Sequence, residues 1–113
     1  MLNSPKAAQH ADADVFAAIA HPVRRQLLDM LSKRDQSVKE LTEPFDMSRP
    51  AISQHLRILL DVGLVSEKRQ GRERHYQLHP EGLREVQRWL QTYQRFWDNR
   101  LEALGNFLEQ QGE

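Results

Sequence analysis

The stretch of residues 37–77 constrains the fold of this chain more than any other part of the sequence. Its patterns predict a short helix, a tight turn, a second helix and then a basic two-stranded hairpin. The second helix is expected over residues 48–60, because Ser48 is a good N-cap residue and Pro50 falls in the first turn, where no backbone N–H is needed. This order of elements predicts a winged helix-turn-helix.

The predicted helix of residues 48–60 has two unlike faces. Apolar residues recur on one face at helical spacing, and they are Ile52, Leu56, Leu59 and Leu60. The outward face is short, polar and cationic, and no acidic residue occurs within residues 48–60. Its members are Arg49, Pro50, Ser53, Gln54 and Arg57, and the N-cap residue Ser48 is a further candidate DNA contact. Such a face suits contact with double-stranded DNA, where Arg binds guanine or phosphate and Gln suits adenine.

The distribution of charge points to the same partner. The whole chain has 16 Lys+Arg and 16 Asp+Glu, so its net charge of zero favours no class of partner. The segment of residues 48–79, however, contains six basic and three acidic residues, which is a local excess of positive charge. The hairpin contributes Lys68, Arg69, Arg72 and Arg74. We therefore expect the hairpin to contact the DNA backbone or minor groove.

Composition excludes several other classes of protein. The chain has no Cys, so disulfides, thiolate metal sites and thiol redox chemistry are excluded. The sequence begins without a secretory signal pattern and has no run near the roughly 18 apolar residues of a membrane span, so a cytoplasmic protein is expected. Ser53 and His55 are two apart on a helix and would point away from each other, and no Gly-rich phosphate loop occurs. No enzymatic function is expected.

The elements before and after the central stretch complete the predicted fold, which is mainly α with a small β-hairpin. Residues 1–12 are expected to form a flexible tail, and residues 13–113 are expected to form a single domain. Helices are expected over residues 14–20 and 22–33, the latter burying Val23, Leu27, Leu28 and Leu31 with Arg24, Arg25 and Asp29 outward. Ser37 caps a third helix with Glu40 at the capping-box spacing. The strands are expected over residues 64–69 and 74–78, with residues 70–72 at the tip.

A long amphipathic helix is predicted over residues 80–110. At about 1.5 Å per residue it would be about 45 Å long, too long to be covered by so small a domain. A second copy of the same helix, together with the first helix, is the expected cover. The residues expected at this dimer surface are Val15, Phe16, Ile19, Leu83, Val86, Leu90, Tyr93, Trp97, Leu101, Leu104 and Leu108.

Other interpretations of this helix stay open. It could fold back on its own domain, or bind a different helical protein. The aromatic residues on and beside its apolar stripe could instead line a pocket for an unknown small-molecule effector near the dimer seam. They are Trp89, Tyr93, Phe96 and Trp97.

Four segments of the chain together carry a resemblance to a known family. They are FAAIAHPVRRQLLDML at residues 16–31, SVKEL at 37–41, MSRPAISQHLRILLDVGLV at 47–65 and KRQGRERHYQL at 68–78. In these segments the sequence resembles the ArsR/SmtB family of winged-helix repressors. The resemblance implies a homodimer built on the first and last helices, with each helix of residues 48–60 in a major groove of an imperfect palindromic operator and each hairpin on the flanking backbone. It also implies repression and a DNA-contacting histidine at His55, with a structural hydrogen bond of that side chain as the alternative.

The chain departs from the metal-sensing pattern of that family. Thiolate sensors carry paired cysteines after Glu-Leu, whereas Thr42, Glu43 and Pro44 follow here. Residues 80–110 contain no His and a single Asp, so the other common sensor site lacks its ligands. His75 and His79 are four apart but straddle the junction of a strand and a helix. The chain therefore resembles a branch without metal or cofactor.

Overall fold

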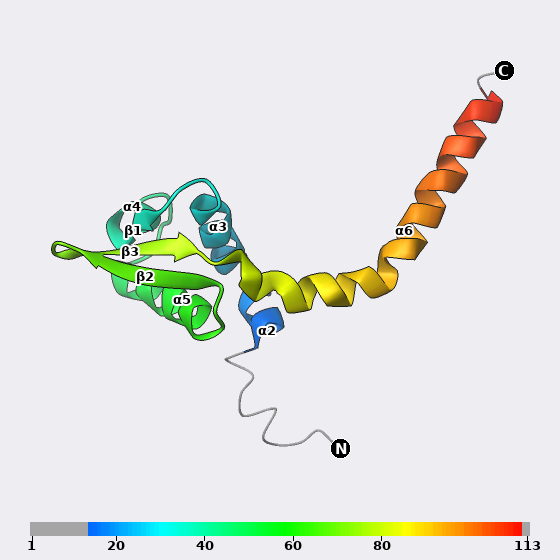
Figure 1. Ribbon diagram of the computed structural model, residues 1–113. Helices are drawn as coiled ribbons and strands as arrows, with labels where there is room; N and C mark the ends of the chain where they lie inside the picture. Colours follow the sequence, from blue (N-terminus) through cyan, green and yellow to red (C-terminus); the bar gives the residue numbers. More distant parts are fainter. Residues whose placement is uncertain (1–13, 112–113) are drawn as a thin grey trace, which may run out of the picture. The chain divides into compact units, whose positions relative to one another are not determined.

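The computed structural model describes residues 14–111, and the chain divides into two compact units at Leu83 and Arg84 (Figure 1). The first unit contains α2 (Val15–Ile19), α3 (Pro22–Leu31), β1 (Gln36–Ser37), α4 (Val38–Thr42), α5 (Arg49–Asp61), β2 (Val65–Gln70), β3 (Glu73–Leu78) and the 3₁₀ turn η2 (Pro80–Leu83). The second unit is the helix α6 (Arg84–Gln111). The helical class with a small wing is confirmed, whereas the predicted tail of residues 1–12 lies outside the described residues.

Each helix from α2 to α5 begins at a residue whose side chain accepts a hydrogen bond from the first turn. Asp14 caps α2, and the ring of His21 caps α3 through a bond from the backbone N–H of Val23. In α4 the predicted capping box is confirmed, because Ser37 and Glu40 each accept a bond from the other's backbone N–H. Ser48 caps α5, as its position before an Arg-Pro start predicted.

The sheet has three antiparallel strands in the order β1-β3-β2 (Figure 1). β2 and β3 form the predicted hairpin, whose turn contains Gly71 at a φ of 63°, a conformation that glycine adopts without strain. β1 was not predicted, because two residues are too few to show any periodicity. It pairs Gln36 with Tyr76 and Ser37 with His75, so the residue that caps α4 also belongs to the sheet.

The core of the first unit lies between α3, α4, α5 and the base of the hairpin. The predicted apolar face of α5 is buried at Ile52, Leu56 and Leu59, whereas Leu60 is only half-buried. The side chains of Leu27, Leu41 and Leu64 are fully buried as well. Burial of one face of α5 therefore fixes which of its side chains face outward.

The predicted helix of residues 80–110 begins differently from expectation. Residues Pro80–Leu83 form a 3₁₀ turn in which the N–H of Gly82 bonds to the carbonyl of His79, three residues back. This turn packs against the loop after α5, where Gly63 has a φ of 80°. A Cβ at Gly82 would meet the backbone carbonyl of Gly63 at less than contact distance, so only glycine fits there. Leu83, predicted as part of the long helix, consequently belongs to η2.

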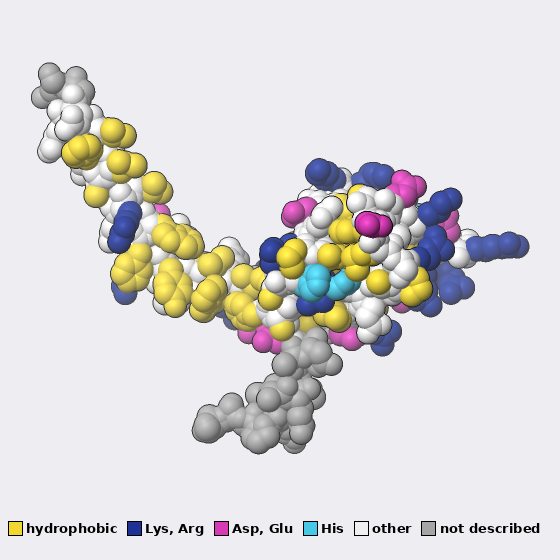
Figure 2. Space-filling model, turned by 180° about the vertical axis from the view of Figure 1, so that it is seen from behind, with side chains coloured by type: hydrophobic (Ala, Val, Ile, Leu, Met, Phe, Trp, Pro, Cys, Tyr) yellow, Lys and Arg dark blue, Asp and Glu magenta, His cyan; other side chains and the backbone are white. Residues whose placement is uncertain are grey.

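The helix α6 is amphipathic and, taken alone, has no buried residue. Hydrophobic side chains form a nearly continuous band along it (Figure 2). The large apolar residues of this band are 42–67% exposed, and they are Trp89, Tyr93, Phe96, Trp97, Leu101, Leu104, Phe107 and Leu108. Among the described residues, no helix is long and apolar enough to span a membrane.

Candidate nucleic-acid interface

The outward face of α5 carries the side chains that the sequence placed there. Arg49, Pro50, Gln54 and Arg57 are exposed, and Ser53 is half-buried. Arg57 forms an ion pair with Asp61 one turn further along, with 3.2 Å between Nε and Oδ1. Because both side chains are exposed, this pair is weak and leaves the guanidinium open to other anions.

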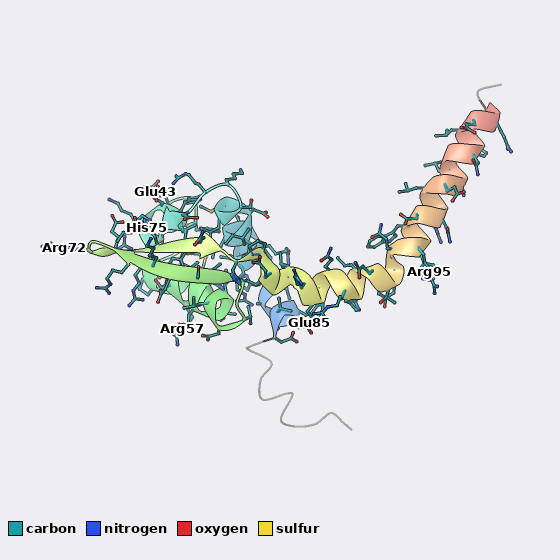
Figure 3. The ribbon with its side chains drawn as sticks, in the orientation of Figure 1. Glu43, Arg57, Arg72, His75, Glu85 and Arg95 are labelled. Carbon is teal, nitrogen blue, oxygen red and sulfur yellow. The ribbon has the colours of Figure 1, made fainter. Side chains whose placement is uncertain are left out.

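The hairpin presents its cationic side chains to solvent. Lys68, Arg69, Arg72 and Arg74 are all exposed, and Lys and Arg side chains gather at the hairpin end of the first unit (Figure 2). Arg72 lies at the tip of the hairpin, at the end away from the helices of the first unit (Figure 3). Such a projecting cationic arm can reach the phosphates of a duplex beside the groove that α5 would enter.

A hydrogen-bond pair braces the hairpin nearer its base. The buried Tyr76 hydroxyl donates to the Glu67 carboxylate over 3.0 Å, and the guanidinium of Arg74 lies 4.0 Å from the same carboxylate. Burial, and then the bond to Glu67, raise the pKa of Tyr76, so the phenol stays protonated and continues to donate. Glu67 therefore links β2 to β3 through Tyr76 and Arg74, and its single negative charge offsets only part of the positive charge of the hairpin.

A groove of about 270 Å³ brings residues from three elements together. It is lined by Arg49 and Ser53 of α5, by Arg72, Glu73 and Arg74 of the hairpin, and by Val38 and Lys39 of α4. Four of the predicted interface residues thus share one surface, whereas Lys68 and Arg69 lie outside the groove lining. Lys39 and Glu73 were not predicted as site residues. The only sequence signal for Lys39 is its place two residues after the N-cap Ser37.

His55 forms a hydrogen bond within the protein, which was one of the two alternatives predicted for this side chain. This half-buried side chain lies with Nδ1 3.1 Å from Nη1 of Arg24, and its ring centroid lies 4.5 Å from that of His21. Since a guanidinium only donates, Nδ1 accepts and the proton of the neutral ring is on Nε2. Burial, then the charges of His21 and Arg24, lower the pKa of His55. A DNA contact through Nε2 stays a prediction.

The outward placement of Arg24 was wrong. Its guanidinium turns back to the end of α2, where Nε donates to the carbonyl of Ala18 over 2.6 Å and Nη2 to that of Ala17 over 3.3 Å. Carbonyls in the last turn of a helix lack partners within the helix, so a neighbouring guanidinium satisfies them. Periodicity could not show this, because a long side chain can reach a site that its Cα does not face.

Acidification is expected to destabilise the first unit through His55. A histidine whose pKa is lowered on folding contributes its full stability above the pKa of the unfolded chain, about 6.5. As the pH falls below that value the unfolded state takes up the proton first, and stability is lost. Thermal unfolding of wild type and His55→Gln between pH 7.5 and 5 checks this, because Gln keeps an acceptor for Arg24 but does not titrate. A variant that loses as much stability as wild type would contradict this role, and His75→Gln is the matched control.

Among the described residues, one histidine lies close to an acidic side chain. His79 lies 3.7 Å from Glu81, but no group of three or more His, Cys, Asp or Glu side chains gathers anywhere in residues 14–111. Two ligands are fewer than a structural zinc site needs.

A short helix, a turn, a helix with an exposed cationic face and a basic hairpin together define the winged helix-turn-helix class of DNA-binding proteins. Residues 21–67 match the family model described as the bacterial regulatory protein, arsR family. The chain belongs to the ArsR family of transcriptional regulators, because it also matches members of that family over nearly their whole length. The family consists of DNA-binding regulators rather than enzymes, which agrees with the sequence prediction.

Two curated relatives and one solved structure illustrate the match. The transcriptional repressor SdpR of Bacillus subtilis is 35% identical over 88 residues, which cover 78% of this chain and 98% of SdpR. The HTH-type transcriptional regulator Rv2034 of Mycobacterium tuberculosis is 34% identical over 87% of this chain and 89% of its own. An ArsR-like transcriptional regulator from Rhodococcus has a TM-score of 0.67 at 33% identity, over 96% of this chain and 97% of that one.

Proposed function

We propose that this protein is a cytoplasmic, homodimeric repressor that binds an imperfect palindromic operator and blocks transcription while bound. The observation that carries the proposal is the shared cationic surface of α5 and the hairpin, where Arg49, Arg72 and Arg74 line one groove. Repression is the function named for SdpR, and the match to this chain covers 98% of SdpR. Two copies related by a two-fold axis would place their α5 helices in half-sites about 34 Å apart.

The residues divide by the kind of contact expected. Exposed Gln54 and half-buried Ser53 are proposed to contact base edges, whereas Arg57 positions the helix on the backbone. Ser48 and Pro50 set the start of α5, and Arg49 contacts guanine or phosphate there. His55 is proposed to add a contact through Nε2–H while Nδ1 is held by Arg24. The hairpin residues bind phosphates, and they are Lys68, Arg69, Arg72 and Arg74.

The apolar band of α6 supports the proposed homodimer. Its large side chains are exposed in one chain, and contiguous apolar surface of this kind usually marks an interface. Val86 and Leu90 extend the band toward the start of the helix. Phe16 and Ile19 of α2 are half-buried and are proposed to join the interface, whereas Val15, at 5% exposed, acts mainly within its own core.

We propose that no metal ion controls DNA binding. The support is the absence of Cys from the chain and the lack of a three-ligand cluster within residues 14–111. Adding Zn²⁺ or arsenite to a protein–DNA complex should leave its dissociation constant unchanged. The alternative of a small-molecule effector bound by Trp89, Tyr93, Phe96 and Trp97 would appear as a ligand-dependent change in Trp fluorescence, accompanied by release of DNA.

The proposed function is tested by selecting bound duplexes from a random pool and titrating the best one at several salt concentrations. A two-fold symmetric consensus, bound about 10³-fold or more tightly than scrambled DNA, is expected of a specific regulator. Salt-sensitive binding without a consensus would instead indicate a nonspecific DNA-coating protein. Absence of binding would contradict the proposal.

Two substitutions separate readout from positioning. Gln54→Ala is expected to change the ranking of operator variants, with a loss of about 1–3 kcal/mol at the base pair it contacts. Arg72→Ala is expected to weaken all sequences about equally and to reduce the salt slope by about one. Binding to a panel of single-base operator variants checks both. An unchanged ranking for Gln54→Ala would show that this side chain does not contact a base.

A further inference from the structure

The groove between α4, α5 and the hairpin carries an excess of positive charge that acidic side chains compensate only in part. Lys39, Arg49, Arg72 and Arg74 line it, against the single carboxylate of Glu73. Of these cations only Arg74 approaches an acid within the described residues, at 4.0 Å from Glu67. Four cations around about 270 Å³ repel one another unless an anion lies among them. The lining therefore carries a net positive charge, which favours an anion there.

The fold holds Lys39 in this position from two sides. Ser37 caps α4 and forms the capping box with Glu40, which fixes the helical turn that carries Lys39. Ser37 also pairs with His75 of β3, the neighbour of Arg74. The start of α4 is thus tied to the strand that carries Glu73 and Arg74, so one hydrogen-bonded network fixes the backbone of α4 relative to that strand.

We propose that this groove binds one phosphodiester of the DNA backbone, with Lys39 as a phosphate-contacting residue and Glu73 as a carboxylate that weakens the binding. The inference rests on the proposed DNA-binding function and adds α4 to the interface. The chemistry fits, because guanidinium groups bind phosphate oxygens in pairs and an ammonium adds a point charge. The bound DNA strand would run from the N-terminal end of α5 toward the tip of the hairpin and would pass over Ser53.

The carboxylate of Glu73 gives the proposal a second, opposite consequence. Glu73 is exposed and forms no ion pair within the described residues, so its charge is not neutralised by a partner. A phosphate in the groove would be repelled by it. Removing this negative charge should therefore strengthen DNA binding, whereas removing the positive charge of Lys39 should weaken it.

The test measures binding of wild type, Lys39→Gln, Glu73→Gln and Lys33→Gln to the selected duplex at four salt concentrations. Lys39→Gln should weaken binding about 3- to 10-fold at 0.1 M salt, lower the salt slope by about one and leave the ranking of operator variants unchanged. Glu73→Gln should strengthen binding about 2- to 5-fold. Lys33→Gln is the matched control, because Lys33 is exposed after the end of α3 and outside the groove lining, so binding should stay within about twofold of wild type.

The outcomes separate this inference from the proposed function. If wild type binds no duplex, the proposed function fails and this inference with it. If wild type binds a consensus but Lys39→Gln behaves like Lys33→Gln, or Glu73→Gln does not strengthen binding, the phosphate site alone is overturned. A further arm replaces chloride with inorganic phosphate at equal ionic strength. Displacement of DNA from wild type but not from Lys39→Gln would show that free phosphate competes with the DNA backbone for this groove, as the proposal expects, whereas equal displacement from both proteins would count against a phosphate site at Lys39.

Discussion

Replacing Leu101 with Glu is expected to convert the protein to a monomer and to weaken operator binding by about 10²–10⁴-fold. When two linked subunits bind two half-sites, the second binding step is intramolecular and raises the overall affinity by this factor. A monomer loses that gain. Leu101 is 67% exposed in the single chain, so the substitution should not disturb the fold of the chain itself. In a dimer, however, the new carboxylate would be buried against apolar side chains, which is strongly unfavourable.

Sedimentation equilibrium and DNA titration of the same samples check this expectation. Asn99→Glu is the matched control, since position 99 lies about 160° around a helix from position 101 and adds the same charge to the opposite face. The control should remain dimeric and bind as wild type does. A Leu101→Glu protein that stays dimeric would show that the apolar band of α6 is not the dimer surface, and a monomeric wild type would overturn the homodimer altogether.

The second large effect is expected at Leu56, on the inner side of the helix that carries the proposed DNA contacts. Its side chain is fully buried, so Leu56→Ala should lower the free energy of unfolding by about 2–5 kcal/mol through lost transfer energy and a residual cavity. For a small domain of modest stability this is a large fraction of the total. The neighbour Arg57 is exposed, so Arg57→Ala should cost less than about 0.5 kcal/mol.

Urea unfolding followed by circular dichroism measures both variants. Leu56→Met, which nearly conserves volume, should cost less than about 1.5 kcal/mol. If Leu56→Ala and Leu56→Met were equally destabilising, shape rather than volume would decide the packing under α5. A loss below about 1 kcal/mol for Leu56→Ala would contradict the buried position of this side chain.

Features that depend on residues within one turn of each other could be predicted from the sequence. Ser48 before Arg-Pro predicted the start of α5, and Ser37 with Glu40 predicted the capping box of α4, because these bonds span only three residues. The apolar spacing of Ile52, Leu56 and Leu59 predicted the buried face of α5 for the same reason. The exposed face followed from it by elimination.

Features that depend on distant partners could not be predicted in this way. Arg24 bonds to carbonyls six and seven residues earlier and to His55, 31 residues later, and no periodicity encodes such a reach. The strand β1 exists because Gln36 and Ser37 pair with Tyr76 and His75 of β3, about forty positions further along the chain. Lys39 became part of a candidate site only through that pairing. Long-range contacts, rather than local propensity, account for the differences between expectation and structure.

The close approach of Gly82 to Gly63 also predicts how the gene can vary. A half-buried position in a short turn ordinarily accepts many residues, since loops tolerate change. Here any side chain would collide with the backbone carbonyl of Gly63, which cannot move aside as a flexible side chain could. In a library of random codons selected for folded protein, position 82 should therefore remain glycine as strictly as a core leucine remains apolar.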